Sequence, residues 1–270
     1  MTTRKLNNGL DMPTLGLGVW QSENGKETID AIHWALEAGY RHIDTARIYE
    51  NEEAVGKALQ SASVDRDKVW LTTKIWNDDI EAGRNTEALD ESLGRLQADY
   101  VDLVLLHWPV AGSEQAWNEL ERAVEAGKVR SIGLSNFMED NIEKILRAGS
   151  IVPAVNQIEY HPYLAQQDAI TASDAHDIAV TAWSPLMQGN FLKEPVFGEI
   201  GERYDKTAAQ VVLRWCLQND VIVIPKSTNR GRIRENGNLF DFELSEEDMQ
   251  QIDALERGKR FGADPHDYGF

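Results

Sequence analysis

The sequence predicts an α/β protein built as one (β/α)8 TIM barrel, with an N-terminal β-hairpin and a short C-terminal tail. Eight short apolar runs recur along the 270 residues, and segments with apolar positions three and four apart lie between them. The length agrees, because a barrel of this kind commonly takes about 250 residues as one unit. No low-complexity linker divides the chain, so residues 1–270 are predicted to form a single domain.

The predicted elements run from a hairpin to an irregular tail. Residues 4–13 form a hairpin around Asn8-Gly9 that is expected to plug the barrel floor. The predicted strands span residues 15–19, 40–44, 69–74, 101–107, 130–134, 154–157, 178–182 and 221–224. Amphipathic helices are predicted at residues 26–38, 86–96, 114–126, 139–148 and 206–217. Residues 258–270 contain glycine, proline and aromatic residues and are predicted to be a non-helical tail.

Residues typical of helix boundaries agree with this periodicity. Thr86 with Glu87, and residues 205–207, are typical of helix starts. Gly39, Gly127 and Gly149 stand where the preceding helices are predicted to stop. Two independent signals, the spacing of apolar residues and the boundary residues, therefore predict the same alternation of strands and helices.

Charge and cysteine content exclude several classes of function. The formal net charge of −18 disfavours binding to nucleic acid and to anionic membranes, and no apolar run approaches the length of about 20 residues that spans a bilayer. Cys216 is the only cysteine, so an intramolecular disulfide and a cysteine-rich metal site are excluded. The six histidines are scattered, His161 near Glu159 is only a weak candidate ligand, and no metal is predicted. We expect a cytoplasmic monomer.

Four titratable side chains fall at or just beyond the ends of three successive predicted strands. Asp44 ends the second strand, Tyr49 follows it by five residues, and Lys74 and His107 lie at the ends of the third and fourth. In a (β/α)8 barrel such positions face one common mouth. Taken singly, each residue has a structural explanation, as a helix cap, a packed aromatic, a surface charge or a core histidine. Their joint placement favours a catalytic site.

This set of groups suits the reduction of a carbonyl compound. A hydride that arrives at the carbonyl carbon leaves negative charge on oxygen, and the phenol of Tyr49 can donate the proton that this oxygen needs. A free phenol has a pKa of about 10, and an ammonium at Lys74 is predicted to lower it. Asp44 would pair with Lys74 and hold it in place, while His107 would hydrogen-bond the substrate oxygen.

Four stretches of the chain resemble the aldo-keto reductase family, and the resemblance covers nearly the whole sequence. They are Gly39-Tyr40-Arg41-His42-Ile43-Asp44-Thr45-Ala46 with Tyr49, Leu106-His107-Trp108-Pro109, Gly133-Leu134-Ser135-Asn136-Phe137 and Ile224-Pro225-Lys226-Ser227. The short loop after His107, the short tail and Trp183 resemble the microbial branch that includes 2,5-diketo-gluconate reductases. The resemblance implies that Asp44, Tyr49, Lys74 and His107 form a catalytic tetrad.

The cofactor implied by the resemblance is NADPH, held by loops at the strand ends. A Rossmann fingerprint is absent, because Gly16-Leu17-Gly18 is followed three positions later by Gln21. In family terms Ser135, Asn136 and Gln157 resemble the carboxamide contacts, and Trp183 resembles the ring on which the nicotinamide stacks, with a core residue as the less favoured alternative.

Further cofactor contacts are expected at Ser184 and Leu186 and in a cluster past the last strand, which comprises Lys226, Ser227, Thr228, Arg232, Glu235 and Asn236. Its basic and hydroxyl groups suit the 2′-phosphate of NADPH, and Arg232 can also lie against adenine. The alternative explanation of the cluster is a solvated helix start over residues 229–234.

The predicted substrate pocket is aromatic. Trp20, Trp76 and Trp108, together with Tyr49 and His107, would wall the space above the nicotinamide, although Trp76 or Trp108 could be packing residues instead. No tyrosine is followed four residues later by lysine and no cysteine zinc lobe is present, so two other dehydrogenase designs are excluded. The expected function is NADPH-dependent reduction of aldehydes, ketones or keto-sugars to alcohols. The alternative is an NADPH-binding barrel that acts as a redox sensor or partner subunit with little turnover.

Overall fold

Eight parallel strands form the centre of the molecule in a computed structural model that describes residues 2–266. They lie in the order β10-β9-β8-β7-β6-β5-β4-β3. Their bounds are β3 Leu17–Gly18, β4 His42–Asp44, β5 Trp70–Ile75, β6 Val101–Leu106, β7 Val129–Ser135, β8 Val155–Glu159, β9 Ala179–Trp183 and β10 Ile222–Val223. Parallel bridges from Leu15 to Val223 and from Gly18 to Lys226 join the last strand to the first. The sheet is therefore the predicted (β/α)8 barrel.

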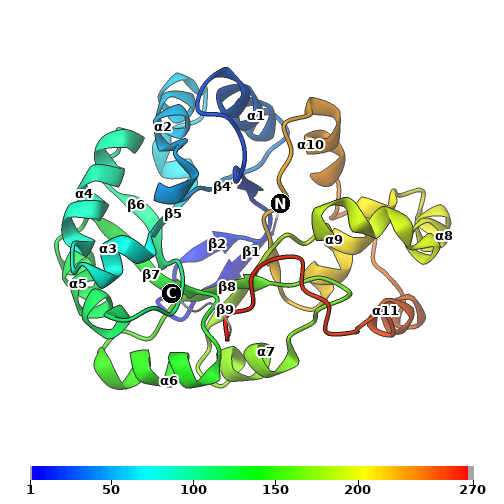
Figure 1. Ribbon diagram of the computed structural model, residues 1–270. Coiled ribbons are helices and arrows are strands. Elements are labelled where there is room, and N and C mark those ends of the chain that lie inside the picture. The colour runs from blue at the N-terminus through cyan, green and yellow to red at the C-terminus, as the bar shows by residue number, and fades with distance from the viewer. Residues whose placement is uncertain (1, 267–270) are drawn as a thin grey trace.

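Helices surround the strands as an outer ring (Figure 1). The five predicted helices correspond to α1 Lys26–Glu37, α4 Asn85–Leu96, α5 Ser113–Glu125, α6 Glu139–Ala148 and α9 Ala208–Gln218. Thr207 caps α9 through a reciprocal pair of hydrogen bonds with Gln210. The sequence prediction did not include α2 Glu52–Ser61, α3 Asn77–Glu81, α7 Gln167–Asp174, α8 Pro195–Tyr204 and α11 Glu246–Asp253. It had α10 Arg230–Asn236 only as an alternative, and it lacked the short 3-10 helices η1 Arg47–Tyr49, η2 Arg66–Lys68 and η3 Met187–Lys193.

The N-terminal hairpin covers the floor of the barrel, as predicted. Its strands are β1 Thr3–Lys5 and β2 Asp11–Pro13, which pair antiparallel. Leu6 and Met12 are buried in a small apolar cluster with strand residues that point into the barrel, among them Leu103 and Val155. Burial of these side chains removes apolar surface at the floor of the barrel from water, and it stabilises the folded protein by roughly 1.5–3 kcal/mol for each large apolar side chain. The main apolar core lies between the strands and the surrounding helices.

The carboxyl ends of several strands differ from the prediction, and two of these differences affect the mouth of the barrel. Strand β8 runs to Glu159 rather than to residue 157, and β9 runs to Trp183 rather than to residue 182. The two residues are partners in the parallel ladder, so they stand side by side at the mouth. Glu159 is charged and does not continue an apolar run, whereas Trp183 is apolar and directly follows the predicted strand, so that boundary is placed one residue early.

The C-terminal tail crosses in front of the strands, where it is drawn in red in Figure 1. Residues 258–266 contain no helix, as predicted, and the predicted remainder of the tail, residues 267–270, lies outside the described residues. Within residues 2–266, none of the helices has the length and apolar character needed to cross a bilayer.

Candidate active site

A pocket of about 360 Å³ opens at the carboxyl ends of the strands. Every residue predicted for the tetrad and the substrate pocket lines it, except Lys74, which lies buried beneath its floor. The lining also includes Ser135, Asn136, Gln157, Trp183 and Ser184, which were predicted as cofactor contacts. Residues from position 18 to position 263 thus contribute to one cavity, because parallel strands deliver their carboxyl ends to the same face.

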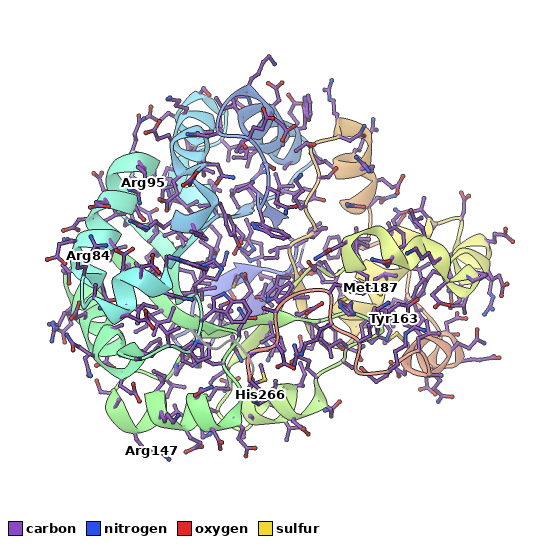
Figure 2. All side chains as sticks on the ribbon, in the orientation of Figure 1. Arg84, Arg95, Arg147, Tyr163, Met187 and His266 are labelled. Atoms are coloured by element: carbon purple, nitrogen blue, oxygen red, sulfur yellow. The ribbon has the colours of Figure 1, made fainter. Side chains whose placement is uncertain are left out.

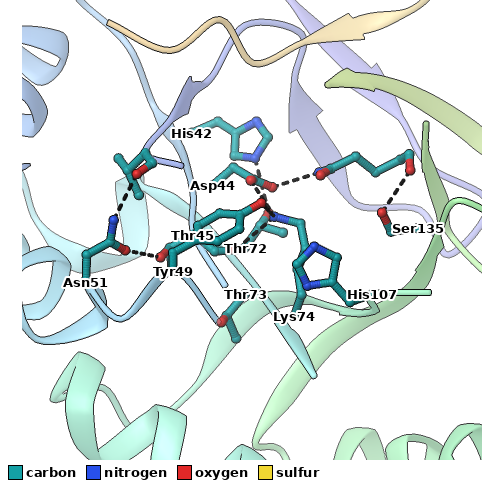
Figure 3. Close-up of polar contacts among 12 residues, drawn as sticks. His42, Asp44, Thr45, Tyr49, Asn51, Thr72, Thr73, Lys74, His107 and Ser135 are labelled. Atoms are coloured by element: carbon teal, nitrogen blue, oxygen red, sulfur yellow. Dashed lines mark hydrogen bonds and ion pairs between the residues drawn. The ribbon is translucent and has the colours of Figure 1, made fainter. Parts of the chain in front are cut away.

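The amine of Lys74 connects three groups at the floor of this pocket (Figure 3). Its Nζ donates to Asp44 Oδ1 at 2.6 Å, to the carbonyl oxygen of Thr45 at 2.9 Å and to Tyr49 Oη at 3.2 Å. An ammonium has three N–H donors, and all three are engaged. The hydroxyl hydrogen of Tyr49 therefore has no acceptor at Lys74 and is free to point away from it.

The carboxylate of Asp44 is held from both sides. Lys74 binds one oxygen, and Gln157 Nε2 donates to the other at 2.7 Å. Asp44 and Lys74 are each almost completely buried, so neither charge has water to stabilise it. The pair is fixed by strands β4, β5 and β8, and this rigid setting determines where the amine meets the phenol.

Burial and the Asp44 carboxylate act on the pKa of Lys74 in opposite directions. Burial lowers the pKa of the amine, but the adjacent carboxylate and the Tyr49 oxygen raise it by more, so the net pKa lies above the ordinary lysine value. Lys74 is consequently an ammonium at neutral pH.

The sequence-based expectation for the pKa of Tyr49 is wrong in its net direction. Burial of the phenol raises the pKa, and the lowering by Lys74 does not overcome it, so the pKa stands above 10. The prediction considered the ammonium and left out desolvation, which disfavours the phenolate. Tyr49 is therefore a neutral phenol that keeps its proton until a stronger base arrives.

The imidazole of His107 is neutral. Burial first, and then the charge of Lys74, lower its pKa well below the ordinary histidine value. Its ring stands edge-on to those of Tyr49 and Trp76, with centroids 5.8 and 5.1 Å away. A neutral imidazole has one N–H to donate, and His107 lines the pocket beside the Tyr49 phenol.

Ser135, Asn136 and Trp183 form a hydrogen-bonded group along the opposite wall. Trp183 Nε1 donates to Asn136 Oδ1 at 2.8 Å, and Asn136 Nδ2 donates to the carbonyl oxygen of His107 at 3.1 Å and to Ser135 Oγ at 3.1 Å. The Trp183 side chain is half-buried and lines the pocket. This placement disagrees with the alternative of a core tryptophan and leaves its ring available as a stacking surface.

The aromatic side chains predicted for the substrate pocket are present in its lining. Trp76 is half-buried, Trp108 is almost fully buried and Trp20 is 45% exposed at the rim. Sequence reasoning did not assign Ile48, Gln188, Phe261, Gly262 or Ala263 to the lining. The last three belong to the tail, which the sequence predicts only as a non-helical segment.

A second cleft of about 710 Å³ adjoins the pocket, and Trp20, Ser184, Gln188 and Lys226 line both. Its lining contains the rest of the predicted cofactor contacts, which are Leu186, Ser227, Thr228, Arg232, Glu235 and Asn236. Lys226 and Arg232 are exposed, and within residues 2–266 no carboxylate forms an ion pair with either of them. Because the chain has a net charge of −18, two unpaired cations in one cleft favour an anionic ligand.

The alternative explanation of this cluster also describes real geometry. Asn229 caps α10, with its side-chain oxygen accepting from the Arg232 amide at 3.0 Å. A capped helix start and an anion-binding cleft are compatible, since the cap uses the Asn229 side chain and the Arg232 backbone amide and leaves the Arg232 side chain exposed. Among the described residues no group of three or more histidine, cysteine, aspartate or glutamate side chains is arranged to hold a metal ion.

Comparison with known proteins gives one family. The model of the aldo/keto reductase family matches residues 14–257. The chain is 46% identical over 269 residues to the 9,11-endoperoxide prostaglandin H2 reductase of Trypanosoma cruzi, with 97% of this chain and 94% of that protein covered. It is 45% identical over 269 residues to the glyoxal reductase of Bacillus subtilis, with 99% and 98% covered. A solved aldo-keto reductase from a Medee basin deep-sea metagenome library has a TM-score of 0.96 at 36% identity, with 99% and 100% covered.

Proposed function

Because the chain belongs to the aldo/keto reductase family of oxidoreductases, we propose that it reduces aldehydes, ketones or keto-sugars to alcohols with NADPH, and that Tyr49 is the general acid. One observation carries the proposal. The Lys74 ammonium donates to the Tyr49 oxygen at 3.2 Å while its other two hydrogens are bound by Asp44 and Thr45. The phenol therefore carries a proton that can be directed into the pocket.

The high pKa of Tyr49 is compatible with this role. The oxygen that gains charge during reduction becomes an alkoxide, which is a much stronger base than a phenolate. A neutral phenol can protonate it, and the phenolate left behind accepts a hydrogen bond from the Lys74 ammonium. Lys74 thus stabilises the form of Tyr49 that exists after proton transfer, and Asp44 keeps the ammonium charged.

His107 positions the carbonyl group. Because the imidazole is neutral, it has a single N–H that can donate to the carbonyl oxygen beside the Tyr49 phenol. Two donors that converge on one oxygen polarise the carbonyl and select its orientation, which is the general role of an oxyanion-type site. The neighbouring rings of Trp76 and Tyr49 restrict the movement of His107.

The residues of the two adjoining cavities fit NADPH. When bound, this cofactor supplies the hydride. Ser135, Asn136 and Gln157 present amide and hydroxyl groups that suit a carboxamide, and Trp183 offers the face of a half-buried indole to a planar ring. Lys226 and Arg232 would bind the 2′-phosphate, helped by the hydroxyl groups of Ser227 and Thr228.

Ser184 and Leu186 would flank the cofactor where the two cavities join, since Ser184 lines both. Glu235 and Asn236 line the second cleft and not the first pocket, and they would contact the adenine end. The proposed fit to NADPH therefore rests on Lys226 and Arg232, two cations that have no carboxylate partner among the described residues, in a cleft next to the half-buried indole of Trp183.

The pocket walls favour compact carbonyl substrates. A cavity of about 360 Å³ lined by Trp20, Trp76 and Trp108 suits a small organic molecule better than a polymer. One of the similar proteins is named a glyoxal reductase, and we propose small 2-oxoaldehydes as the first substrates to test.

The direct test follows NADPH consumption by absorbance at 340 nm with a panel of aldehydes, diketones and keto-sugars. We expect turnover with at least one small carbonyl compound, and a Tyr49→Phe variant that still binds NADPH but loses turnover by about 10²- to 10⁴-fold. Binding of NADPH without consumption in the unmodified protein would favour the redox sensor or partner subunit instead.

The cofactor preference has its own test. Arg232→Ala should raise the KM for NADPH at least about tenfold, because one charge-assisted bond to phosphate contributes roughly 1.5–3 kcal/mol. The KM for NADH should change by less than about twofold. Equal effects on the two cofactors would refute the assignment of Arg232 to the 2′-phosphate.

A further inference from the structure

A buried carboxylate stands at the mouth of the barrel outside the tetrad. Glu159 is the last residue of β8, and its side chain and that of His161 are both 0% exposed. Glu159 is two residues beyond Gln157 on the same strand, so the two side chains share the face that points toward the pocket. The mechanism proposed above uses Gln157 and gives no task to Glu159.

Three N–H groups converge on this carboxylate. Oε1 accepts from His161 Nε2 at 3.0 Å and from the backbone amide of Phe261 at 2.6 Å, and Oε2 accepts from the backbone amide of Gly262 at 3.2 Å. Two of the three donors therefore come from the tail, about a hundred residues further along the chain. A buried carboxylate needs such donors, because it has no water to bind.

The tail is also packed into place at this point. The Phe261 ring lies on His161 and Tyr163, with centroids 5.3 and 6.2 Å away, and the Lys259 amide donates to the carbonyl oxygen of Tyr163 at 2.9 Å. Figure 2 labels Tyr163 near the start of the tail and His266 near its described end. The pocket lining includes Phe261, Gly262 and Ala263, so this packed segment is a wall of the cavity.

Gly262 fits where no larger residue does. A Cβ atom built at this position would lie 2.2 Å from Cη2 of Trp183, closer than real Cβ contacts. The tail backbone thus touches the indole that we assign to the cofactor ring. The register of β8 and β9, which pairs Glu159 with Trp183, places the carboxylate and the indole against the same short stretch of tail.

From this geometry we propose that Glu159 is a positioning residue for the tail, and that its carboxylate fixes Phe261 and Gly262 as a rigid wall of the substrate pocket. The inference deepens the proposed function and rests on it, because the wall belongs to the site assigned to carbonyl reduction. The wall selects among substrates by size, since a small carbonyl compound held by Tyr49 and His107 does not reach it and a larger one does.

The variant Glu159→Gln tests this role with little change in volume. One carboxylate oxygen becomes an amide NH2 group, which donates and cannot accept, so the Phe261 and Gly262 amides can no longer both be satisfied. For phenylglyoxal we expect KM to rise and kcat/KM to fall about tenfold, with kcat changed by less than twofold. For methylglyoxal both constants should stay within about twofold of the unmodified enzyme.

Glu194→Gln is the matched control. Glu194 is also acidic and accepts from Arg257, the residue directly before the tail, at 3.0 Å, while Tyr163 makes a second contact. It does not line the pocket within the described chain. This variant should leave the preference between the two substrates unchanged. Should Glu159→Gln lower kcat/KM for both substrates in parallel, or for neither, the positioning role is overturned.

A second readout does not depend on turnover. Hydrogen exchange measured by mass spectrometry on peptides that span residues 257–266 should be at least about tenfold faster in Glu159→Gln, and unchanged in Glu194→Gln at the Phe261 and Gly262 amides. Equal protection in the two variants would overturn the proposal even if the protein proved not to reduce carbonyl compounds. Conversely, faster exchange in a protein without turnover would leave Glu159 as the residue that holds the tail and remove only its link to substrate choice.

If Glu159→Gln does not fold, Gly262→Ala provides the same test with the carboxylate intact. The added methyl group collides with the outer ring of Trp183, so the tail backbone and the indole must move apart and the wall at this position is disturbed. The same fall in the preference for phenylglyoxal is expected, and an unchanged preference would refute a fixed wall at this position.

Discussion

Replacement of Lys74 separates its contribution to stability from its contribution to chemistry. The side chain is 0% exposed, and Lys74→Met removes its bonds to Asp44, Thr45 and Tyr49. Asp44 then keeps only the bond from Gln157, as a buried and uncompensated charge. Removal of one partner from such a pair costs about 3–5 kcal/mol, which is a large part of the free energy of unfolding of an ordinary domain.

The double variant Lys74→Met with Asp44→Asn removes both charges together. We expect it to be at least as stable as the less stable of the two single variants, which requires a coupling energy of at least about 3 kcal/mol because each single replacement costs about 3–5 kcal/mol. Urea unfolding followed by tryptophan fluorescence at pH 7–8 measures all four proteins. At this pH the contribution of Lys74 is fully present, because its raised pKa means that the stability is lost only as the pH rises from the ordinary lysine pKa of about 10.4 through the folded value.

Carbonyl reduction is expected to respond differently. The two variants that lack Lys74 should lose kcat by at least about 100-fold, since neither keeps an ammonium beside Tyr49, and the recovery of stability in the double variant should bring no recovery of turnover. Strictly additive losses of stability would refute the buried pair as described. Recovery of turnover together with stability would show that Lys74 acts only as a structural residue.

The structure supports two further predictions away from the reacting atoms. Burial lowers the pKa of His42 to about 4, so between pH 6.5 and 4 the unfolded chain binds a proton that the folded protein does not, and the free energy of unfolding should fall by about 3 kcal/mol as the pH drops through this range. In His42→Asn, denaturation curves taken across the same range should show a smaller dependence of stability on pH. An unchanged dependence would contradict a neutral buried imidazole. Gly56→Ala should destabilise the protein by about 1–3 kcal/mol, because its Cβ would lie 2.5 Å from the Leu96 carbonyl oxygen where α2 crosses α4. In the control Gly94→Ala the added Cβ meets nothing within 4 Å, and this variant should be more stable by up to about 1 kcal/mol. Equal shifts of Tm in the two variants would argue against the close contact at Gly56.

The tetrad could be located from the sequence because its placement follows from strand periodicity and barrel geometry alone. Asp44 and Lys74 are 30 residues apart, yet each stands at a strand end, and in a parallel barrel such positions meet. A shift of one or two residues in a predicted boundary does not move them to another face of the molecule. The catalytic roles of these residues stay predictions until the variants are measured.

The electrostatic balance at Tyr49 could not be obtained in the same way. The sequence names the neighbouring ammonium, and it does not tell how much water the fold removes from the phenol. In the structure desolvation is the largest influence on the pKa of Tyr49, and it reverses the expected net shift. Only the packed arrangement fixes the desolvation of the phenol, because burial depends on every element around the site.

Contacts of the tail were beyond sequence reasoning for another reason. The bond between Glu159 and Phe261 joins positions 102 residues apart, and neither residue belongs to a periodic pattern that extends to the other. His161 and Glu159 did stand out as a weak metal pair. In the structure, backbone amides of the tail donate to Glu159 instead. The composition of the tail does not predict these contacts.

The two buried carboxylates at the mouth of the barrel, Asp44 and Glu159, accept hydrogen bonds from different parts of the chain. Both partners of Asp44, Lys74 and Gln157, stand on strands of the barrel, so their geometry holds whether or not the tail is in place. Two of the three donors to Glu159 belong to the tail, so a departing tail would leave a buried carboxylate with a single partner. Seating of the tail is therefore enforced by the cost of an unsatisfied charge. The pair of Asp44 and Lys74 rests on rigid strands, while the wall formed by Phe261 and Gly262 is a loop held by its own hydrogen bonds.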